Sequence, residues 1–288
     1  MKQLTVVSGK GGTGKTSLVG SFACLTRNKV MADCDVDAAD LHLLFSLVKE
    51  RASEFRGGKL AIIDEEKCSR CGLCEEVCQF GAISEFKVDP TECEGCSLCW
   101  RVCPEEAITM KTKLIGNWFI CQTPQGPLVN ARLEPGEENS GKLVSLVREK
   151  AQELAQKKGY DFILIDGSPG IGCPVIASLS GVDMALVVTE PTVSGMSDME
   201  RIMGVCQHFT IPAIVCINKF DLNLTNSHKI EEYCAKQGCE VVGEIPFDID
   251  FIKAQVAGKS IVEYSQGDVA AGVRELWKRI SRTLTLDE

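Results

Sequence analysis

Eight of the sixteen cysteines in this 288-residue sequence follow one spacing twice. Four cysteines are separated by two, two and three residues, and the same spacing returns 25 residues later, where Ala82-Ile83 also returns as Ala107-Ile108. In a reducing cytosol, such a concentration of cysteines indicates metal ligands or redox chemistry rather than disulfide bonds. The predicted metal ligands are Cys68, Cys71, Cys74, Cys78, Cys93, Cys96, Cys99 and Cys103.

A glycine-rich segment near the amino terminus could bind phosphate. Residues 9 to 16 fit the pattern G-x-x-x-x-G-K-[ST], in which backbone N–H groups surround phosphate oxygens. Lys15 would reach the terminal phosphates and Thr16 would coordinate Mg²⁺, whereas the alternative is a plain glycine-rich turn. The predicted nucleotide contacts on this loop are Gly9, Lys10, Gly11, Gly12, Thr13, Gly14, Lys15, Thr16 and Ser17.

Carboxylates follow two apolar runs that could be strands. Asp35 and Asp37 come after residues 29–32, and Asp166 closes the run 161–165. Carboxylates at strand ends beside a phosphate loop suit contact with Mg²⁺ through water, or orientation of the attacking water. Asp166 resembles the Walker B aspartate, and this resemblance implies that it holds the metal through water. We expect Asp35 to be the catalytic carboxylate. Asp37 is the second choice, and its alternative role is to cap the next turn.

These residues need a scaffold, which the hydrophobic pattern predicts. Short runs rich in Val, Ile and Leu are typical of parallel strands buried on both faces, and the stretches between them have helical spacing. Strands that alternate with helices predict a doubly wound α/β fold with a mainly parallel sheet. The predicted strands are 3–7, 29–32, 161–165, 184–189, 213–217 and 240–245, and the predicted helices are 15–27, 143–157, 194–208, 227–237 and 269–284.

The segment K-G-G-T-G-K-T at residues 10–16 resembles the deviant phosphate loop of the MinD, ParA and nitrogenase iron protein superfamily. In that superfamily the extra lysine reaches across a nucleotide-sandwich dimer to the partner's phosphates. The resemblance therefore implies this role for Lys10, and with it an ATP-dependent homodimer. Asp35 and Asp166 match the positions of the superfamily's two switch segments. The resemblance implies an ATPase that uses Mg²⁺, with Lys10, Lys15, Asp35 and Asp166 as catalytic residues.

Asn218 and Pro246 are predicted to contact the base. The motif Asn-Lys-x-Asp that begins at Asn218 resembles the guanine-reading motif of GTPases, which would imply GTP. The superfamily instead uses this asparagine for adenine, and it lines the other side of the base at the position of Pro246. The resemblance therefore implies ATP as the nucleotide.

The cysteine-rich stretch resembles a two-cluster bacterial ferredoxin, in which the fourth cysteine of each run binds the other cluster. Zinc is the competing metal, but eight cysteines in a duplication favour two 4Fe-4S clusters. Gln79 departs from the pattern, because a proline is expected there and is present in the second run as Pro104. The resemblance assigns one cluster to Cys68, Cys71, Cys74 and Cys103, and the second cluster to Cys93, Cys96, Cys99 and Cys78.

The resemblances together predict three segments. Residues 1–59 and 113–288 would form a P-loop ATPase domain, and residues 60–112 would form an inserted α+β ferredoxin-like domain. Residues 126–142 would connect the insert to the next long helix as a mechanical linker.

Charge and hydropathy limit the partners and the location. The net charge of −9 argues against nucleic acid as a main partner, and residues 60–111 hold eleven acids against five bases, which favours a redox partner with a basic docking surface. No apolar run is long enough to span a membrane, and the glycine-rich loop stands where a signal peptide would be, so we expect a cytoplasmic protein. The apolar face of residues 269–284 fits a membrane-surface helix or a packed helix. We expect packing and no stable membrane insertion.

These patterns support three functions. The leading hypothesis is an ATPase that couples nucleotide-driven dimer rearrangement to electron transfer through two 4Fe-4S clusters. An iron-sulfur cluster carrier or assembly ATPase is second, although eight ligands in a closed ferredoxin fold argue for permanent clusters. A regulatory or positioning ATPase whose clusters sense redox state is third.

Overall fold

The structure is a computed structural model that describes residues 1–137 and 141–286. The chain forms two compact units. The first comprises Met1–Ala52, Trp118–Arg132 and Asn139–Glu288, and the second comprises Ser53–Asn117 and Leu133–Glu138. The predicted insert, residues 60–112, lies within the second unit, and its boundaries as a domain remain a prediction.

Over the described residues, nine strands form one sheet in the order β11-β10-β9-β1-β8-β2-β7-β6-β3. The pairs β1–β8, β1–β9, β9–β10, β10–β11, β2–β8 and β2–β7 are all parallel. The strands are β1 (Lys2–Ser8), β2 (Lys29–Asp33), β3 (Lys49–Ile63), β6 (Ile108–Thr123), β7 (Gly126–Leu133), β8 (Phe162–Pro169), β9 (Met184–Thr189), β10 (Ala213–Asn218) and β11 (Glu240–Ile245).

Helices cover both faces of this sheet, as a doubly wound fold requires. Alternate residues of the central strands form one apolar core with α1 and α10, while α4 packs against β2 and α5 against β8 without entering that core. The helical elements of the first unit are α1 (Lys15–Leu25), η1 (Leu41–Leu44), α4 (Lys142–Lys158), α5 (Cys173–Leu179), α6 (Val193–His208), η2 (Phe220–Leu222), α7 (Leu224–Gln237), α8 (Asp250–Val256), α9 (Ile261–Tyr264) and α10 (Asp268–Leu284).

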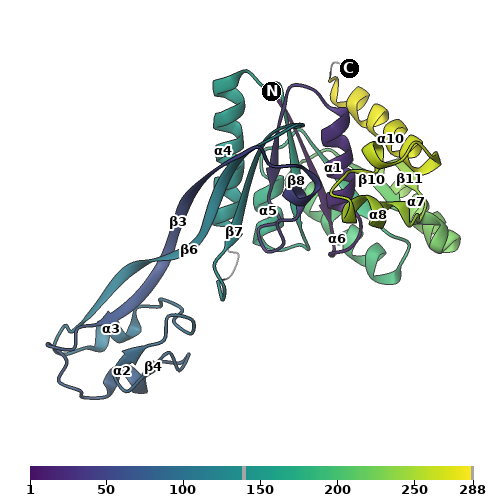
Figure 1. Cartoon of the computed structure of the whole chain (residues 1–288). Coiled ribbons are helices and arrows are strands. Elements are labelled where there is room, and N and C mark those ends of the chain that lie inside the picture. Colours follow the sequence, from purple (N-terminus) through teal and green to yellow (C-terminus); the bar gives the residue numbers. More distant parts are fainter. Residues whose placement is uncertain (138–140, 287–288) are drawn as a thin grey trace. The chain divides into compact units, whose positions relative to one another are not determined.

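The last helix, α10, packs on the sheet as predicted. The ring of Trp277 lies 5.0 Å from that of Phe22 on α1 and 6.0 Å from that of Phe162 on β8. Figure 1 shows α1 and α10 together on one side of the sheet. Among the described residues, no helix is both long enough and apolar enough to cross a membrane.

The α/β fold with a mostly parallel sheet is confirmed, but three strands of the nine-stranded sheet, β3, β6 and β7, were not predicted. β7 lies in the expected linker, 126–142, and instead pairs in parallel with β2, with Met31 opposite Leu128. Pro127 and the buried Asn130 interrupt its apolar run, which hides this strand from a hydropathy pattern. β3 and β6 are long strands of mixed polarity, and each begins in one unit and ends in the other.

The second unit repeats its local structure. It contains α2 (Leu73–Glu76) and α3 (Leu98–Val102), which contact each other, and the antiparallel pair β4 (Ile83–Ser84) and β5 (Lys87–Val88). Each short helix follows a residue with a left-handed backbone, at φ 84° before α2 and φ 66° before α3. The small core of this unit consists of Ala61, Cys74, Ile83, Cys99 and Ile108.

Candidate functional site

The predicted phosphate loop connects β1 to α1. Gly12 and Gly14 have φ values of 79° and 90°, a left-handed conformation that favours glycine. A Cβ on Gly14 would lie 2.3 Å from Nδ2 of Asn218, because the loop packs closely against the end of β10. The loop therefore leaves its N–H groups at the start of α1, where a helix favours anions.

Two glycines of this loop differ in how closely they are packed. A Cβ on Gly9 would lie 2.1 Å from Cβ of Asp198 on α6, whereas a Cβ on Gly11 would meet nothing within 4 Å. We expect Gly9→Ala to lower the free energy of unfolding by about 1–3 kcal/mol through overpacking. Gly11→Ala is the matched control, with an expected change within about 0.5 kcal/mol. Urea unfolding measures both, and equal losses would contradict the packing seen here.

Lys15 lies among buried carboxylates at the start of α1. Its Nζ is 2.5 Å from Oδ1 of Asp166 and 3.5 Å from Oδ2 of Asp35. Burial alone would lower the pKa of Lys15, but the attraction of Asp166 and Asp35 outweighs it, so the pKa is raised. The first unit thus holds a permanent cation where the terminal phosphates of a nucleotide were predicted.

Asp33 and Asp166 complete this cluster at the ends of β2 and β8. Asp33 is fully buried and accepts hydrogen bonds from the N–H groups of Asp35 and Leu41, both at 3.1 Å. Burial and the nearby Asp166 raise the pKa of Asp33 well above its usual value. Oδ2 of Asp166 is buried without a hydrogen-bond partner in the described chain, and such an atom is costly unless it is matched. A water of hydrated Mg²⁺ would match it, so the predicted metal role of Asp166 fits.

The ionisation of Asp35 gives a prediction for stability against pH. Burial raises the pKa of Asp35 to about 6, despite the attraction of Lys15. Because the folded pKa exceeds the unfolded value of about 3.9, ionisation of Asp35 costs stability as the pH rises from about 4 to 6. Asp35→Asn cannot ionise, so we expect it to match the parent protein in urea unfolding at pH 4 and to exceed it at pH 7.5. A difference that does not change between the two pH values would contradict this.

A cavity of about 740 Å³ extends from the phosphate loop past the ends of the strands. This volume is within the range of small-molecule sites. Of the predicted residues, Gly9, Lys10 and Asp166 do not line it. Those that do are Gly11, Gly12, Thr13, Gly14, Lys15, Thr16, Ser17, Asp35, Asp37, Asn218 and Pro246.

The end of the cavity formed by residues 246–252 is mainly apolar, with Asp248 as its one charged lining residue. Pro246 lies there with Phe247, Phe251 and Ile252, three residues that the sequence pattern did not separate from core positions. Asn218 donates a hydrogen bond from Nδ2 to the carbonyl of Thr13 at 2.7 Å, and its Oδ1 has no partner within residues 1–137 and 141–286. Asn218 therefore braces the loop and also presents an acceptor that a base could use.

Lys10 is held within its own chain in this structure. Its Nζ lies 2.5 Å from Oε1 of Glu190 and donates to the hydroxyl of Thr192 at 3.3 Å. The other oxygen of Glu190 pairs with Nζ of Lys219 at 3.1 Å, and Lys219 donates to the carbonyl of Gly12 at 3.0 Å. Burial would raise the pKa of Glu190, but its hydrogen bonds with Lys10 and Lys219 lower it. No sequence motif had pointed to Glu190.

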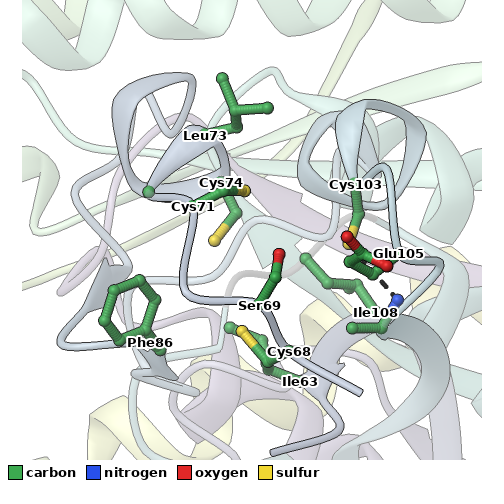
Figure 2. A pocket seen from close by; sticks show the side chains of 12 residues that line it. Ile63, Cys68, Ser69, Cys71, Leu73, Cys74, Phe86, Cys103, Glu105 and Ile108 are labelled. Atoms are coloured by element: carbon green, nitrogen blue, oxygen red, sulfur yellow. Dashed lines mark hydrogen bonds between the residues drawn. The ribbon is translucent and has the colours of Figure 1, made fainter.

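The second unit contains two pockets, each lined by four cysteines. Three cysteines of each pocket come from one run and the fourth comes from the other run. Figure 2 shows the first pocket, with the side chains of one run on one side and Cys103 on the other. The first pocket is lined by Cys68, Cys71, Cys74 and Cys103, and the second by Cys93, Cys96, Cys99 and Cys78.

The environment of these thiols is partly apolar. Burial raises the pKa of Cys74 and Cys99, and the N–H of Ala107 donates to Sγ of Cys103 at 3.3 Å. Within the described part of the chain, no three His, Cys, Asp or Glu side chains are arranged to hold one metal ion. A 4Fe-4S cluster is bound by four thiolates that surround it, so the four cysteines of each pocket fit that group as a donor set. The cluster assignment remains a prediction.

A phosphate loop between the first strand and the first helix, with acids at the ends of the adjacent parallel strands, defines a P-loop nucleotide-binding protein. The family described as the CobQ/CobB/MinD/ParA nucleotide binding domain matches residues 4–261. This chain belongs to that family and is a MinD/ParA-like P-loop ATPase, a type for which ATP and Mg²⁺ are expected.

Three similar proteins illustrate the relationship. An uncharacterized protein of Methanocaldococcus jannaschii is 34% identical over 284 residues, which cover 96% of each chain. An iron-sulfur cluster carrier protein of Pyrococcus horikoshii is 25% identical over 138 residues, which cover 43% of this chain and 46% of that one. A solved structure similar to this one is the septum site-determining protein MinD of Pyrococcus horikoshii, complexed with Mg-ADP. The two align with a TM-score of 0.59 at 15% identity, over 98% of this chain and 96% of the MinD chain. That structural likeness shows the fold alone, and a ferredoxin-like insert is not part of what these comparisons show.

Proposed function

We propose that this protein is an ATPase that couples nucleotide-driven rearrangement of a homodimer to electron transfer through two 4Fe-4S clusters in its second unit. The observation that carries the proposal is the pair of four-cysteine pockets, each built from three cysteines of one run and one of the other. A zinc ribbon would instead collect two Cys-x-x-Cys pairs around one ion. When bound, each cluster supplies a one-electron redox centre.

The surroundings of the pockets support this use. Ile63 and Ile108 line the first pocket and Ala61 and Met110 line the second, so apolar groups surround the sulfur atoms. The hydrogen bond from Ala107 to Cys103 adds a backbone donor to one thiolate. Burial and hydrogen bonds to sulfur are the means by which a protein sets the potential of an iron-sulfur centre.

The nucleotide site supplies the driving reaction. We propose that Lys15 binds the terminal phosphates and that Thr16 and Asp166 hold Mg²⁺, as their positions around the loop allow. With a pKa of about 6, Asp35 is mostly ionised at neutral pH, so its carboxylate can accept a hydrogen bond from the attacking water. Asn218 and Pro246 would contact adenine at the apolar end of the cavity.

A chain of contacts in the first unit supports the coupling. Asp33 holds the N–H of Leu41 at the start of η1, and the next residue, His42, accepts a hydrogen bond at Nε2 from Arg132 of β7 at 2.7 Å. The guanidinium of Arg132 lies 5.6 Å from the ring of Phe119 on β6. Burial and Arg132 lower the pKa of His42, which keeps the ring a neutral acceptor. β6 itself begins in the second unit, so a shift of the acid cluster has a physical route along this strand.

The test is anaerobic reconstitution of the full chain with iron and sulfide, followed by iron analysis and EPR with and without MgATP. We expect eight irons per chain and a reduction rate or spectrum that changes with ATP. His42→Ala should keep the iron and the ATPase rate but lose the ATP effect, whereas His228→Ala, a 70% exposed histidine, should keep all three. Iron far below eight would refute the clusters, and an ATP-independent spectrum and rate would refute the coupling.

A cluster carrier is the second candidate, which the partial match to an iron-sulfur cluster carrier protein favours. A carrier gives up its cluster, whereas the two buried thiols Cys74 and Cys99 favour retention. Incubation of the reconstituted chain with an apo-ferredoxin separates the two: transfer of iron to the acceptor supports the carrier, and retention supports electron transfer.

A further inference from the structure

We propose that the second cysteine pocket, lined by Cys78, Cys93, Cys96 and Cys99, is the one that exchanges electrons with a partner protein, through a docking surface centred on Phe80 and Leu98. The inference rests on the proposed function, since it assigns different roles in electron transfer to the two predicted clusters. The partner that fits is a small redox protein whose exposed apolar patch is rimmed by Lys and Arg.

The internal duplication provides a matched comparison, because both halves share one backbone framework. Leu73 and Leu98 occupy equivalent positions 25 residues apart and are 40% and 41% exposed. Gly81 and Glu106 both have positive φ, at 65° and 47°, and their N–H groups donate to the carbonyls of Cys78 and Cys103 at 3.2 and 3.3 Å. Differences in side chains between the halves are therefore not imposed by the backbone.

The halves differ at the rim of the pockets. Phe80 lines the second pocket and is 47% exposed, while its equivalent at the first pocket is the exposed Glu105. Trp100, which directly follows Cys99, is 50% exposed, while its equivalent Glu75 accepts a hydrogen bond from the N–H of Phe86 at 2.8 Å. Glu105 occupies the position of Phe80 in the same turn of the other half, so the turn itself does not require an aromatic ring. We infer that the exposed ring of Phe80 serves contact with another molecule.

Each pocket is lined by one glutamate, Glu105 at the first and Glu94 at the second, and the pockets differ in the charges nearby. Glu94 lines the second pocket and the exposed Glu92 lies two residues before it. At the first pocket, the guanidinium of Arg70 lies 5.9 Å from the ring of Phe86, which lines that pocket. Arg70 therefore weakens the attraction of a basic partner to the first pocket, whereas Glu92 and Glu94 strengthen it at the second.

The kind of partner follows from the size and character of this surface. Residues 60–111 carry eleven acids against five bases, so long-range attraction favours a basic protein. A few exposed apolar residues with an acidic rim match the small interfaces of transient redox encounters, below about 1,200 Å². Cys96 is exposed beside Leu98, so a partner seated on this surface would approach the sulfur directly.

Cytochrome c, a basic haem protein, is a suitable probe. The reconstituted full chain is reduced with dithionite and freed of excess reductant, and mixing transfers one electron from the chain to the ferric haem, which becomes ferrous. Stopped-flow absorbance gives the rate, and calorimetry gives the binding constant independently of electron transfer. The variants are Phe80→Ser and Leu98→Ser, and the matched control is Leu73→Ser at the equivalent position.

We expect Phe80→Ser and Leu98→Ser each to lower the binding constant and the second-order rate at least about tenfold, as residues at the centre of an interface do. Leu73→Ser should change neither, and added salt should slow the parent reaction. The inference would be overturned if chains that hold eight irons showed equal losses of binding and rate in Leu73→Ser and Leu98→Ser. It would also be overturned if no variant lost either. Failure of the parent chain to hold the clusters would overturn both this inference and the proposed function.

Discussion

Replacement of Lys15 by methionine is expected to abolish hydrolysis of MgATP and to lower the free energy of unfolding by about 3–5 kcal/mol. The side chain of Lys15 is 6% exposed and neutralises Asp166, which is 1% exposed, and Asp35, which is 12% exposed. Removal of the cation leaves these carboxylates with Asp33 in a buried cluster of like charge, and such a cluster is costly without a counter-ion. Urea unfolding at pH 7.5 and a phosphate-release assay measure the two effects.

A double variant separates the two roles of this lysine. Lys15→Met combined with Asp166→Asn removes the cation and one carboxylate together, so much of the lost stability should return. Hydrolysis should not return, because the contact with the terminal phosphates is still missing. Recovery of hydrolysis in the double variant would show that Lys15 acts only through the stability of the acid cluster. Stability that is unchanged in Lys15→Met would contradict the ion pairs of the structure.

The central strands and their helices could be predicted because each is a continuous apolar run of ordinary length. The run that ends before Asp166 is an example, since β8 is buried on both faces. β7 escaped prediction because Asn130 is buried in it and only its partners in the sheet decide that it is a strand. β3 and β6 escaped because long, half-exposed strands have no apolar face that a sequence reveals.

The candidate site divides in a similar way. Lys15 and the loop glycines follow from a local motif, because the phosphate loop is one continuous segment. Glu190 could not be predicted, since its importance depends on two lysines that are distant in sequence and meet it only in the fold. The apolar end of the cavity was also missed. Phenylalanine is a common core residue, and only the fold shows that Phe247 lines the cavity and is 49% exposed.

Removal of the charge on Lys10 is expected to have the second large effect. Unlike removal of Lys15, it should lower hydrolysis and leave stability nearly unchanged. Lys10→Ala is expected to lower MgATP hydrolysis at least about 100-fold, because a cation supplied to the phosphates by a partner chain contributes about 10³–10⁵ in related phosphoryl-transfer enzymes. Its effect on stability should stay within about 1 kcal/mol, since the side chain is 32% exposed in its pair with Glu190. Sedimentation velocity with a slowly hydrolysed ATP analogue should show a monomer for this variant and a dimer for the parent protein. A variant that forms dimers and hydrolyses ATP as the parent does would refute the role across the dimer.

Glu190 tests the same role from the opposite side. In the described structure its carboxylate holds Lys10 at 2.5 Å, so the role predicted for Lys10 in a dimer requires it to leave Glu190 first. Glu190→Gln removes the charge that holds Lys10, and it should lower the concentration of the ATP analogue needed for half-maximal dimer formation about fivefold, a change that corresponds to about 1 kcal/mol. Lys219→Met is the control, because it removes the other cation bound to Glu190 and leaves that carboxylate wholly to Lys10. It should therefore raise the concentration needed. Shifts of the same sign in both variants would show that Glu190 acts by bracing the loop through Gly12 rather than by restraining Lys10.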